Sequence, residues 1–499
     1  MSSPLRTRDA AEAAGPGAPL PRNTPAAEGV DARGIKRFLD AVEASPALQP
    51  RSLAILRHGR VIASGCWAPY RADGPYMIYS LSKSLTSTAL GLAVDEGLLR
   101  LDDRVVGFFP ELDVDDPRTR SMRVRDLAAM STGHRAEMWR AAFEADPVEP
   151  VRGFLRLPPD QDPGTLFAYN QPATYTLATI LQRVTGSTLT EYLRPRLLEP
   201  IGAGAVSWQQ YPAGRDVGFL GAFTTSDTIL RLGALYLQRG LWGGRRVLPE
   251  SWVAQATSRQ VSTENEPHPD WRQGYGFGFW MSRHGFRGDG AYGQYSLVLP
   301  EQNAVVAYTG ATVEMQSVLN LAWRHLLPAF DGAGSQSDDD ELMRRLETLS
   351  LPPVAAEPGA PTGPQRWSAT FAAAEGRCAA QHSLTGIEVV GGDEPEVVLR
   401  EAGTSLRLRL GQGRWIVSDP SAGSGEPAVP VAVSGGPADA ATLRFEALFL
   451  ETPHRLVVTC NRNTGTFDAT WSTPPLQPLE LRDLHAPRAS KATPVEPRS

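Results

Sequence analysis

The chain has 499 residues, 41% of them hydrophobic and 21% charged, which is typical of a globular protein with two or three domains. Its net charge of −6 at pH 7 argues against a nucleic-acid-binding protein, because such a protein needs a basic face. The three cysteines give no disulfide framework and the eight histidines show no H-x-x-x-H pair, so the composition argues against a metal site.

The N-terminal segment, residues 1–27, is rich in Ala, Pro and Gly, which predicts a flexible arm. It lacks the apolar run of a signal peptide, and no later stretch is apolar for long enough to cross a membrane. We therefore expect a cytoplasmic protein that binds no membrane.

Periodic structure begins with residues 29–45, whose apolar residues recur at helical spacing and predict an amphipathic helix. Residues 52–67 then predict two strands joined by a turn at residues 57–60, which is a β-hairpin. Residues 81–99 predict a mostly apolar helix, so we expect that helix to be buried.

Between residues 104 and 250 helical stretches alternate with loops, and residues 172–186 and 226–240 are the clearest helices. Residues 275–310 have strand character, and residues 315–330 return to helix. A sheet with strands from both ends of this region and helices between them predicts an α/β fold of the α+β type, with an antiparallel sheet flanked by helices. We expect it to form one domain, residues 28–332.

The C-terminal part changes in composition. Residues 333–366 are polar and rich in Pro and Gly, which predicts a linker with one short helix. Residues 367–483 carry short alternating runs separated by turn signals, which predicts an antiparallel β domain with an aromatic core. The tail, residues 484–499, is expected to be disordered.

Lysine is rare in this chain, and one lysine stands in a distinctive place. Of 49 basic residues only three are lysines, namely Lys36, Lys83 and Lys491. Arginine stays protonated in proteins, whereas a buried lysine can lose its proton, so a site that needs a neutral amine cannot use arginine. Lys83 follows Ser80 by three residues at the start of the buried helix, and residues at this spacing share a helix face.

Ser80 therefore has two interpretations. At a helix N-terminus, where free backbone N–H groups favour negative charge, it can be a nucleophile beside a potential base. A serine there is also a common N-cap, and capping and catalysis are compatible at this geometry.

The S-L-S-K stretch, Ser80–Lys83, and the residues that follow it resemble the serine β-lactamase and penicillin-binding-protein superfamily, and within it the class C β-lactamase-like group. The similarity extends over residues 28–330. Further matching stretches follow in the right order, at residues 85–112, 124–134 and 163–186. The resemblance implies a transpeptidase-like catalytic domain, a lipocalin-like C-terminal β domain and a serine hydrolase activity without a cofactor.

The resemblance also implies a tyrosine motif at Tyr169-Asn170-Gln171, in which Tyr169 is the phenolic partner of Ser80. Either Lys83 or Tyr169 can then act as the base, and this choice stays open. Gln171 stands where the family has Asn, and its amide is expected to bind substrate.

The third motif of the family, Lys-Thr-Gly or His-x-Gly, aligns with Gly288-Asp289-Gly290. Gly290 keeps the close backbone approach, and the N–H groups of Ser80 and Ala291 are expected to form the oxyanion hole. The family's cation is missing, and strand alternation points Arg287 away from its position. This change disfavours a true β-lactamase or D,D-carboxypeptidase, and Asp289 is either a surface turn residue or an element of substrate selection.

We therefore predict a serine hydrolase that acts on an ester or amide through an acyl-enzyme on Ser80, most simply an esterase. Two alternatives remain: an acyltransferase or peptide cyclase of a biosynthetic pathway, and a non-catalytic binding or sensing protein of the same fold. The expected partner is a small-molecule or peptide acyl substrate, with no nucleic acid and no cofactor. The sequence does not predict the oligomeric state.

Overall fold

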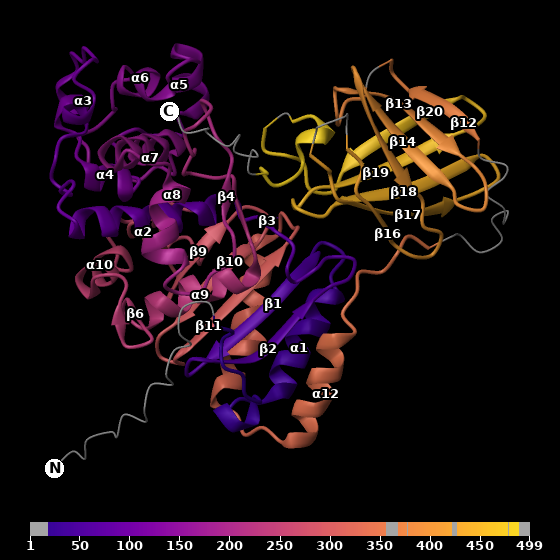
Figure 1. Cartoon of the computed structure of the whole chain (residues 1–499), viewed down its shortest axis with the longest axis horizontal. Helices are drawn as coiled ribbons and strands as arrows, with labels where there is room; N and C mark the ends of the chain where they lie inside the picture. Colours follow the sequence, from indigo (N-terminus) through magenta and orange to yellow (C-terminus); the bar gives the residue numbers. More distant parts are fainter. Residues whose placement is uncertain (1–17, 356–367, 377, 422–426, 478, 489–499) are drawn as a thin grey trace, which may run out of the picture. The chain divides into compact units, whose positions relative to one another are not determined.

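The computed structural model describes residues 18–355, 368–376, 378–421, 427–477 and 479–488 (Figure 1). The predicted arm, linker and tail therefore lie partly outside the described residues. The chain divides into two compact units. Among the described residues, the first unit comprises residues 18–65, 78–310 and 314–347, and the second comprises residues 66–77, 311–313 and those from 348 to 488.

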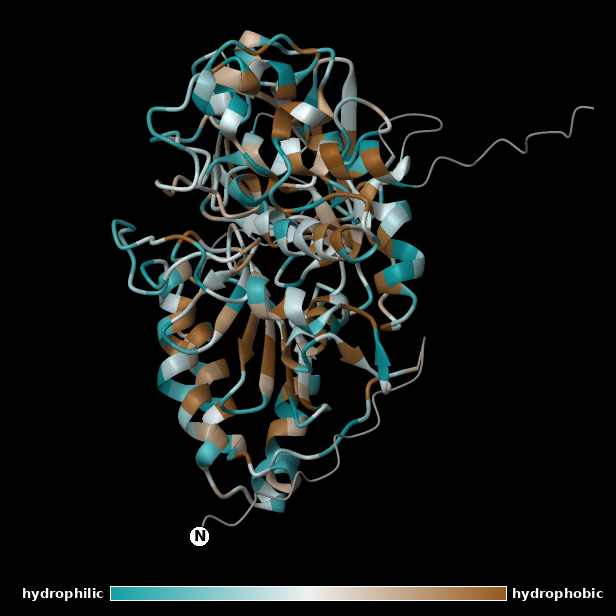
Figure 2. Cartoon of the chain, turned by 90° about the vertical axis from the view of Figure 1, so that its left-hand side faces the viewer, coloured by the Kyte–Doolittle hydropathy of each residue, from teal (hydrophilic) through white to brown (hydrophobic). Residues whose placement is uncertain are grey.

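A six-stranded sheet forms the centre of the first unit, in the order β2-β1-β11-β10-β9-β8. Its strands are β1 (Pro50–Arg57), β2 (Arg60–Cys66), β8 (Trp280–Met281), β9 (Phe286–Gly290), β10 (Gln294–Leu299) and β11 (Ala304–Gly310). The pairs β1–β11, β11–β10, β10–β9 and β9–β8 are all antiparallel. Hydrophobic residues run along these strands (Figure 2), and β10 and β11 are buried over their whole length. A strand buried on both faces needs cover on both faces.

Helices supply this cover. The helices of the first unit are α1 (Ala32–Glu43), α2 (Ser82–Asp95), α3 (Pro117–Ser121), α4 (Val124–Ala128), α5 (Trp139–Ala145), α6 (Pro150–Leu155), α7 (Gln171–Thr185), α8 (Leu189–Leu193), α9 (Ser226–Leu237), α10 (Glu250–Ala256), α11 (Met315–Leu321) and α12 (Gln336–Glu347). Phe38 of α1 packs against Tyr308 of β11, with ring centroids 6.2 Å apart. Gly233 of α9 lies against Val305 of the same strand. Because residues 305 and 308 point to opposite faces of a strand, α1 and α9 cover opposite faces of the sheet.

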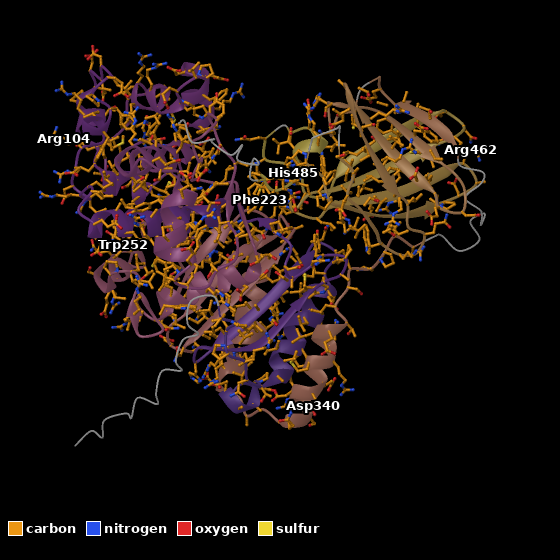
Figure 3. All side chains as sticks on the ribbon, viewed as in Figure 1. Arg104, Phe223, Trp252, Asp340, Arg462 and His485 are labelled. Carbon is orange, nitrogen blue, oxygen red and sulfur yellow. The ribbon has the colours of Figure 1, made fainter. Side chains whose placement is uncertain are left out.

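The helix that carries the serine–lysine pair, α2, is buried among other helices. Its neighbour α10 places the indole ring of Trp252, labelled in Figure 3, where a Cβ on Gly91 would lie. Glycine at this position therefore lets the two helices approach closely. Short strands complete the first unit: β4 (Ser207–Trp208), β5 (Ala222–Thr224), β6 (Leu241–Trp242) and β7 (Arg245–Arg246).

The second unit is a β domain whose nine-stranded sheet runs in the order β15-β14-β13-β12-β20-β19-β18-β17-β16. Its strands are β3 (Tyr76–Met77), which lies outside that sheet, β12 (Ala369–Ala373), β13 (Leu384–Val390), β14 (Glu396–Glu401), β15 (Thr404–Arg409), β16 (Ile416–Ser418), β17 (Val431–Pro437), β18 (Thr442–Phe449), β19 (Arg455–Asn461) and β20 (Thr466–Trp471). Neighbouring strands are antiparallel except β12 and β20, which pair in parallel. The backbone N–H of Arg409, at the end of β15, donates to Ser418 Oγ on β16 at 3.0 Å, so the sheet nearly closes on itself.

The predicted fold class is confirmed: an antiparallel sheet is flanked by helices and a largely antiparallel β domain follows. The predicted strand character of residues 276–279 is wrong, because Tyr275 forms only isolated bridges and the strand β8 begins at Trp280. A Cβ on Gly276 would lie 2.0 Å from the carbonyl oxygen of Ala256, and Gly278 has a φ of +74°. These residues therefore turn closely past neighbouring backbone instead of extending.

Helix α12 differs in extent from the short helix expected in the linker. It spans twelve residues and packs beside α1 in the first unit (Figure 1). Lys36 of α1 forms an ion pair with Glu341 of α12 at 2.6 Å, and Leu342 and Leu346 are buried. The polar composition of the segment conceals this apolar stripe. Near the N-terminus, the N–H of Asn23 donates to the carbonyl of Val61 at 3.1 Å, so part of the predicted arm lies along β2.

Candidate active site

Ser80 lies in a short 3₁₀ turn, η2 (Tyr79–Leu81), that leads directly into α2. Tyr79, immediately before it, has a φ of +46°, which is strained for a residue with a side chain. The Tyr79 ring packs against the ring of Tyr292, with centroids 5.3 Å apart. This contact holds the turn in place, and Ser80 remains partly exposed at the start of the helix.

The Lys83 side chain turns back toward Ser80, as the i, i+3 spacing predicts. Its Nζ lies 3.1 Å from Ser80 Oγ, 2.8 Å from Gln171 Oε1 and 2.8 Å from the carbonyl oxygen of Phe219. The side chain is almost completely buried, with 2% of its surface exposed. Three oxygen atoms therefore surround one amine that is shielded from solvent.

Burial lowers the pKa of Lys83 to about 7, because desolvation disfavours the ammonium form. The negative charges of Glu137 and Asp289 act in the opposite direction and raise this pKa in part. Near neutral pH the amine is therefore present in both protonation states, which suits a general base. An arginine at this position would remain charged.

The hydrogen-bond partners of Lys83 also orient the neutral amine. A carbonyl oxygen, as in Gln171 Oε1 and Phe219 O, can only accept hydrogen bonds. The two N–H groups of a neutral amine would satisfy these two acceptors. The lone pair would then face the third neighbour, the Ser80 hydroxyl, which can donate its proton to it.

Helix α2 is held in place by hydroxyl groups around Lys83. The Ser84 hydroxyl donates to the carbonyl of Gly278 at 2.8 Å, and the Thr86 hydroxyl donates to the carbonyl of Gly218 at 2.8 Å. Ser82 Oγ accepts the N–H of Ala222 at 3.1 Å. The serine and threonine residues of this helix therefore satisfy buried backbone groups of two adjacent segments, which fixes the position of Lys83.

Tyr169 lies on the other side of the amine. Lys83 Nζ is 4.7 Å from the centroid of its ring, and the ring stacks on Trp280 with centroids 5.4 Å apart. Burial raises the pKa of Tyr169 well above its usual range, and a hydrogen bond to Ser80 lowers it only in part. The raised pKa favours the neutral phenol, which donates a proton more readily than it accepts one.

The two residues after Tyr169 have different partners. Asn170 is fully buried, and its Oδ1 accepts the N–H of Met138 at 3.0 Å. Gln171 begins α7 and directs its side chain to Lys83. Its backbone N–H donates to Glu137 Oε1 at 3.3 Å, which brings an exposed carboxylate to the same place.

The third motif lies on β9, which runs against the Ser80 turn. A Cβ on Gly290 would lie 2.1 Å from the carbonyl oxygen of Ile78 and 3.1 Å from the nitrogen of Leu81. Only glycine permits this approach, which brings the next residue, Ala291, beside the turn. The side chain of Gln294 donates to the carbonyl of Ala291 at 3.1 Å and helps to hold this peptide.

Asp289 is buried and paired. Arg287 Nε donates to Asp289 Oδ2 at 2.8 Å, and the exposed fractions of the two side chains are 0% and 6%. Residues two apart on a strand share a face, so Arg287 and Asp289 lie together while Gly288 points the other way. Burial raises the pKa of Asp289, and the Arg287 charge opposes this effect. The surface-turn interpretation of Asp289 is therefore wrong.

Besides Asp289, two backbone carbonyls and a hydroxyl group hold the Arg287 side chain in place. Its Nη1 donates to the carbonyl oxygens of Asp270 and Met281 and to Ser282 Oγ, at 2.9, 3.0 and 2.7 Å. Its guanidinium lies 4.4 Å from the ring centroid of Trp271. A cation is thus present near the third motif, but it is already bound to Asp289.

The structure brings Ser80, Lys83, Tyr169 and Gln171 together around the amine, with Gly290 packed against the Ser80 turn. Their catalytic and binding roles stay predictions. Sequence reasoning missed three groups at this site: the Phe219 carbonyl, the Glu137 carboxylate and the Trp280 ring. A backbone carbonyl carries no sequence signal, and Glu137 and Trp280 lie outside the short motif stretches that match the family.

In the residues that the structure describes, no group of three or more His, Cys, Asp or Glu side chains is arranged to hold a metal ion. None of the helices in the described part of the chain combines the length and the apolar character needed to span a membrane.

An antiparallel sheet with helices on both faces and a serine–lysine pair at the start of a buried helix define a hydrolase of the β-lactamase and penicillin-binding-protein fold. The family model described as Beta-lactamase matches residues 37–329, more than half of the chain. The chain belongs to the Beta-lactamase family, and the resemblance found in the sequence is confirmed.

Similar proteins are named as hydrolases. The 6-aminohexanoate-dimer hydrolase of Paenarthrobacter ureafaciens is 27% identical over 287 residues, which are 50% of this chain and 70% of that protein. The lovastatin esterase of Penicillium rubens is 28% identical over 181 residues, 32% of this chain and 45% of that protein. The solved structure of "EstCE1, a hydrolase with promiscuous acyltransferase activity" has a TM-score of 0.50 at 17% identity, covering 60% of this chain and 99% of that one, which shows a shared fold.

Proposed function

We propose that this hydrolase cleaves esters of small organic acids through an acyl-enzyme on Ser80. One observation carries the proposal: a buried amine, whose pKa is lowered to about 7, lies 3.1 Å from the Ser80 hydroxyl. A serine hydroxyl is a weak nucleophile unless a nearby base accepts its proton, and Lys83 has the position and the basicity for this role.

In the first step the neutral Lys83 amine takes the Ser80 proton as Oγ attacks the ester carbonyl. The new C–O bond leaves a negative charge on the former carbonyl oxygen. The backbone N–H groups of Ser80 and Ala291 would stabilise this charge, because β9 brings Ala291 beside the Ser80 turn. The start of α2 contributes in the same direction.

The tetrahedral intermediate then collapses, and the bond to the leaving alcohol breaks. Tyr169 is neutral near pH 7 because burial raises its pKa, and it is hydrogen-bonded to Ser80. It is therefore suited to donate the proton that the leaving oxygen needs. Its phenolate would recover a proton from the Lys83 ammonium, 4.7 Å from its ring. Water releases the acyl group from Ser80 by the same steps in reverse order.

Esters are the preferred substrates for two reasons. An alkoxide leaves more readily than an amine anion, so the reaction makes a smaller demand on the proton donor. The cation next to the third motif, Arg287, is already paired with Asp289. A substrate that binds through its own carboxylate, such as a penicillin, therefore finds no unpaired cation beside the third motif. Of the two sequence relatives, the one named as a lovastatin esterase agrees with this substrate class, whereas the 6-aminohexanoate-dimer hydrolase is named for a dimer of an amino acid, which is joined by an amide bond.

A chromogenic ester assay on the wild type and on Ser80→Ala tests the proposal. We expect the wild type to hydrolyse 4-nitrophenyl esters of short acids and the variant to lose at least about 10³-fold in kcat/KM. Rapid quenching followed by intact mass measurement should find one acyl group on the wild type and none on the variant. Equal rates in both proteins would exclude Ser80 as the nucleophile, and a stable adduct without turnover would favour the sensing protein.

A further inference from the structure

A free carboxylate lies at the edge of the proposed active site. Glu137 Oε1 accepts the N–H of Trp139 at 2.8 Å and the N–H of Gln171 at 3.3 Å. Gln171 in turn accepts a hydrogen bond from Lys83, the neighbour of Ser80. Two backbone N–H groups therefore hold this carboxylate in one position, and Gln171 links it to the Lys83 amine.

Glu137 has no ion-pair partner within the described parts of the chain. Acidic residues close to it in the chain are paired with arginines, namely Glu144 with Arg140 and Asp146 with Arg152. Glu137 is exposed, although its charge reaches the buried Lys83 and raises the pKa of that amine. Its second oxygen is thus available to a ligand.

The other carboxylate that acts on Lys83 is not available in this way. Asp289 is buried and its Oδ2 accepts the Nε–H of Arg287 at 2.8 Å. The pair is close to neutral as a unit. Of the two acidic residues beside the site, only Glu137 therefore presents an uncompensated negative charge to an entering substrate.

The residue whose backbone N–H binds this carboxylate, Trp139, carries an aromatic ring on the same side of the site, because the ring contacts Phe219 and the centroid of the Phe219 ring lies 5.8 Å from Lys83 Nζ. Trp139, the first residue of α5, is partly exposed, and its ring packs on Phe219 with centroids 4.7 Å apart. A tryptophan face attracts cations through its quadrupole, and a carboxylate attracts them through its charge. An exposed carboxylate and a partly exposed tryptophan two residues apart in the chain form a suitable surface for an ammonium group.

The geometry points to Glu137 as a specificity-determining residue that binds a positively charged group of the acyl substrate, with Trp139 beside it. The substrate class is then an ester with an ammonium or similar cationic group on its acyl chain. This inference rests on the proposed hydrolysis at Ser80. It adds a charge preference to that reaction and changes none of its steps.

A matched pair of esters measures this preference. The cationic probe is the 4-nitrophenyl ester of 4-(trimethylammonio)butyrate, and the neutral probe is the ester of 5,5-dimethylhexanoate, in which carbon replaces nitrogen. A quaternary ammonium cannot attack its own ester, and both probes have the same shape. Homologous pairs with two to five methylene groups cover different distances to the charge. Each rate is divided by the rate of spontaneous hydrolysis of the same ester.

In the wild type the corrected kcat/KM should favour the cationic ester by about tenfold at low salt for at least one chain length, and less at high salt. Glu137→Gln keeps the acceptor for both N–H groups and removes the charge, so its ratio should fall to within about threefold of unity. Glu144→Gln is the control, because Glu144 is an exposed glutamate on α5 paired with Arg140, and it should keep the wild-type ratio.

A ratio near unity at every chain length in the wild type would overturn the inference, and so would a ratio that Glu137→Gln leaves unchanged. If the ratio falls equally in Glu144→Gln, the preference arises from the negative charge around α5 in general and not from Glu137, which would also overturn the inference. Failure of the proposed function gives a different result: neither probe would then react faster with the wild type than with Ser80→Ala.

Discussion

Lys83 Nζ lies 3.1 Å from Ser80 Oγ, and the same nitrogen contacts two carbonyl oxygens that can only accept hydrogen bonds. The position of this amine, its burial and its lowered pKa form one arrangement, because burial both removes solvent and fixes the three partners. The proposed chemistry depends on the amine being able to lose its proton.

Replacing Lys83 by arginine should abolish activity although it preserves the positive charge. A guanidinium does not deprotonate near neutral pH, so it cannot accept the Ser80 proton. We expect kcat/KM for a 4-nitrophenyl ester to fall at least about 10³-fold. Lys36→Arg is the matched control, since Lys36 pairs with Glu341 away from the site and should retain full activity. An active Lys83→Arg variant, with its folding verified by circular dichroism, would rule out Lys83 as the base.

The rate of ester hydrolysis should fall as the pH is lowered below neutral. Below a pKa of about 7 the Lys83 amine is protonated and cannot act as a base, so kcat/KM should fall about tenfold for each pH unit below it. Above this value the amine is neutral and the rate should reach a plateau. Initial rates of ester hydrolysis between pH 5 and 9, corrected for spontaneous hydrolysis, give the profile. A flat profile through this range would disagree with the proposed base.

Tyr169→Phe should affect poor leaving groups more than good ones. The phenylalanine ring can keep the stacking on Trp280 and loses only the hydroxyl that is proposed to protonate the leaving oxygen. A 4-nitrophenolate leaves without protonation, whereas an alkoxide needs a proton. We expect a loss of about 10²–10⁴-fold for an alkyl ester and a much smaller loss for the 4-nitrophenyl ester of the same acid. Equal losses for both esters would assign Tyr169 to another step.

Gly290→Ala should distort the site through the backbone. The added Cβ would meet the carbonyl oxygen of Ile78 at 2.1 Å, so β9 must move away from the Ser80 turn and carry Ala291 with it. We expect kcat to fall by about 10²–10³-fold, as for the loss of one oxyanion donor. Gly107→Ala is the control, because a Cβ at Gly107 meets no atom within 4 Å. Unchanged kcat in Gly290→Ala would remove Ala291 from the proposed oxyanion hole.

Much of this arrangement follows from local sequence patterns. Helical spacing predicted α1, α2, α7 and α9, and the Ser80–Lys83 contact follows from the i, i+3 geometry of a helix alone. The period-two pattern and turn residues predicted the β1–β2 hairpin. These features depend on neighbours in the chain, and a single sequence contains that information.

The remaining parts of the site depend on distant segments. Phe219 contributes a backbone carbonyl, which any residue type could supply. Glu137 has its place because Trp139 and Gln171 present N–H groups to it. The Arg287–Asp289 pair overturned one expectation: Asp289 is buried and paired with Arg287 and does not lie in a surface turn. A pattern cannot reveal a partner of this kind before the fold is known.

The most direct test of the central claim is a titration of Lys83 itself. The chain has only three lysines, so lysine labelled with ¹³C at Cε gives few NMR signals, and the signal missing from Lys83→Met identifies the residue. The chemical shift of this signal should titrate with a pKa of about 7. A Lys83 signal that titrates at the ordinary lysine value of about 10.4 would contradict the account, because the amine would then be protonated whenever Ser80 must lose its proton.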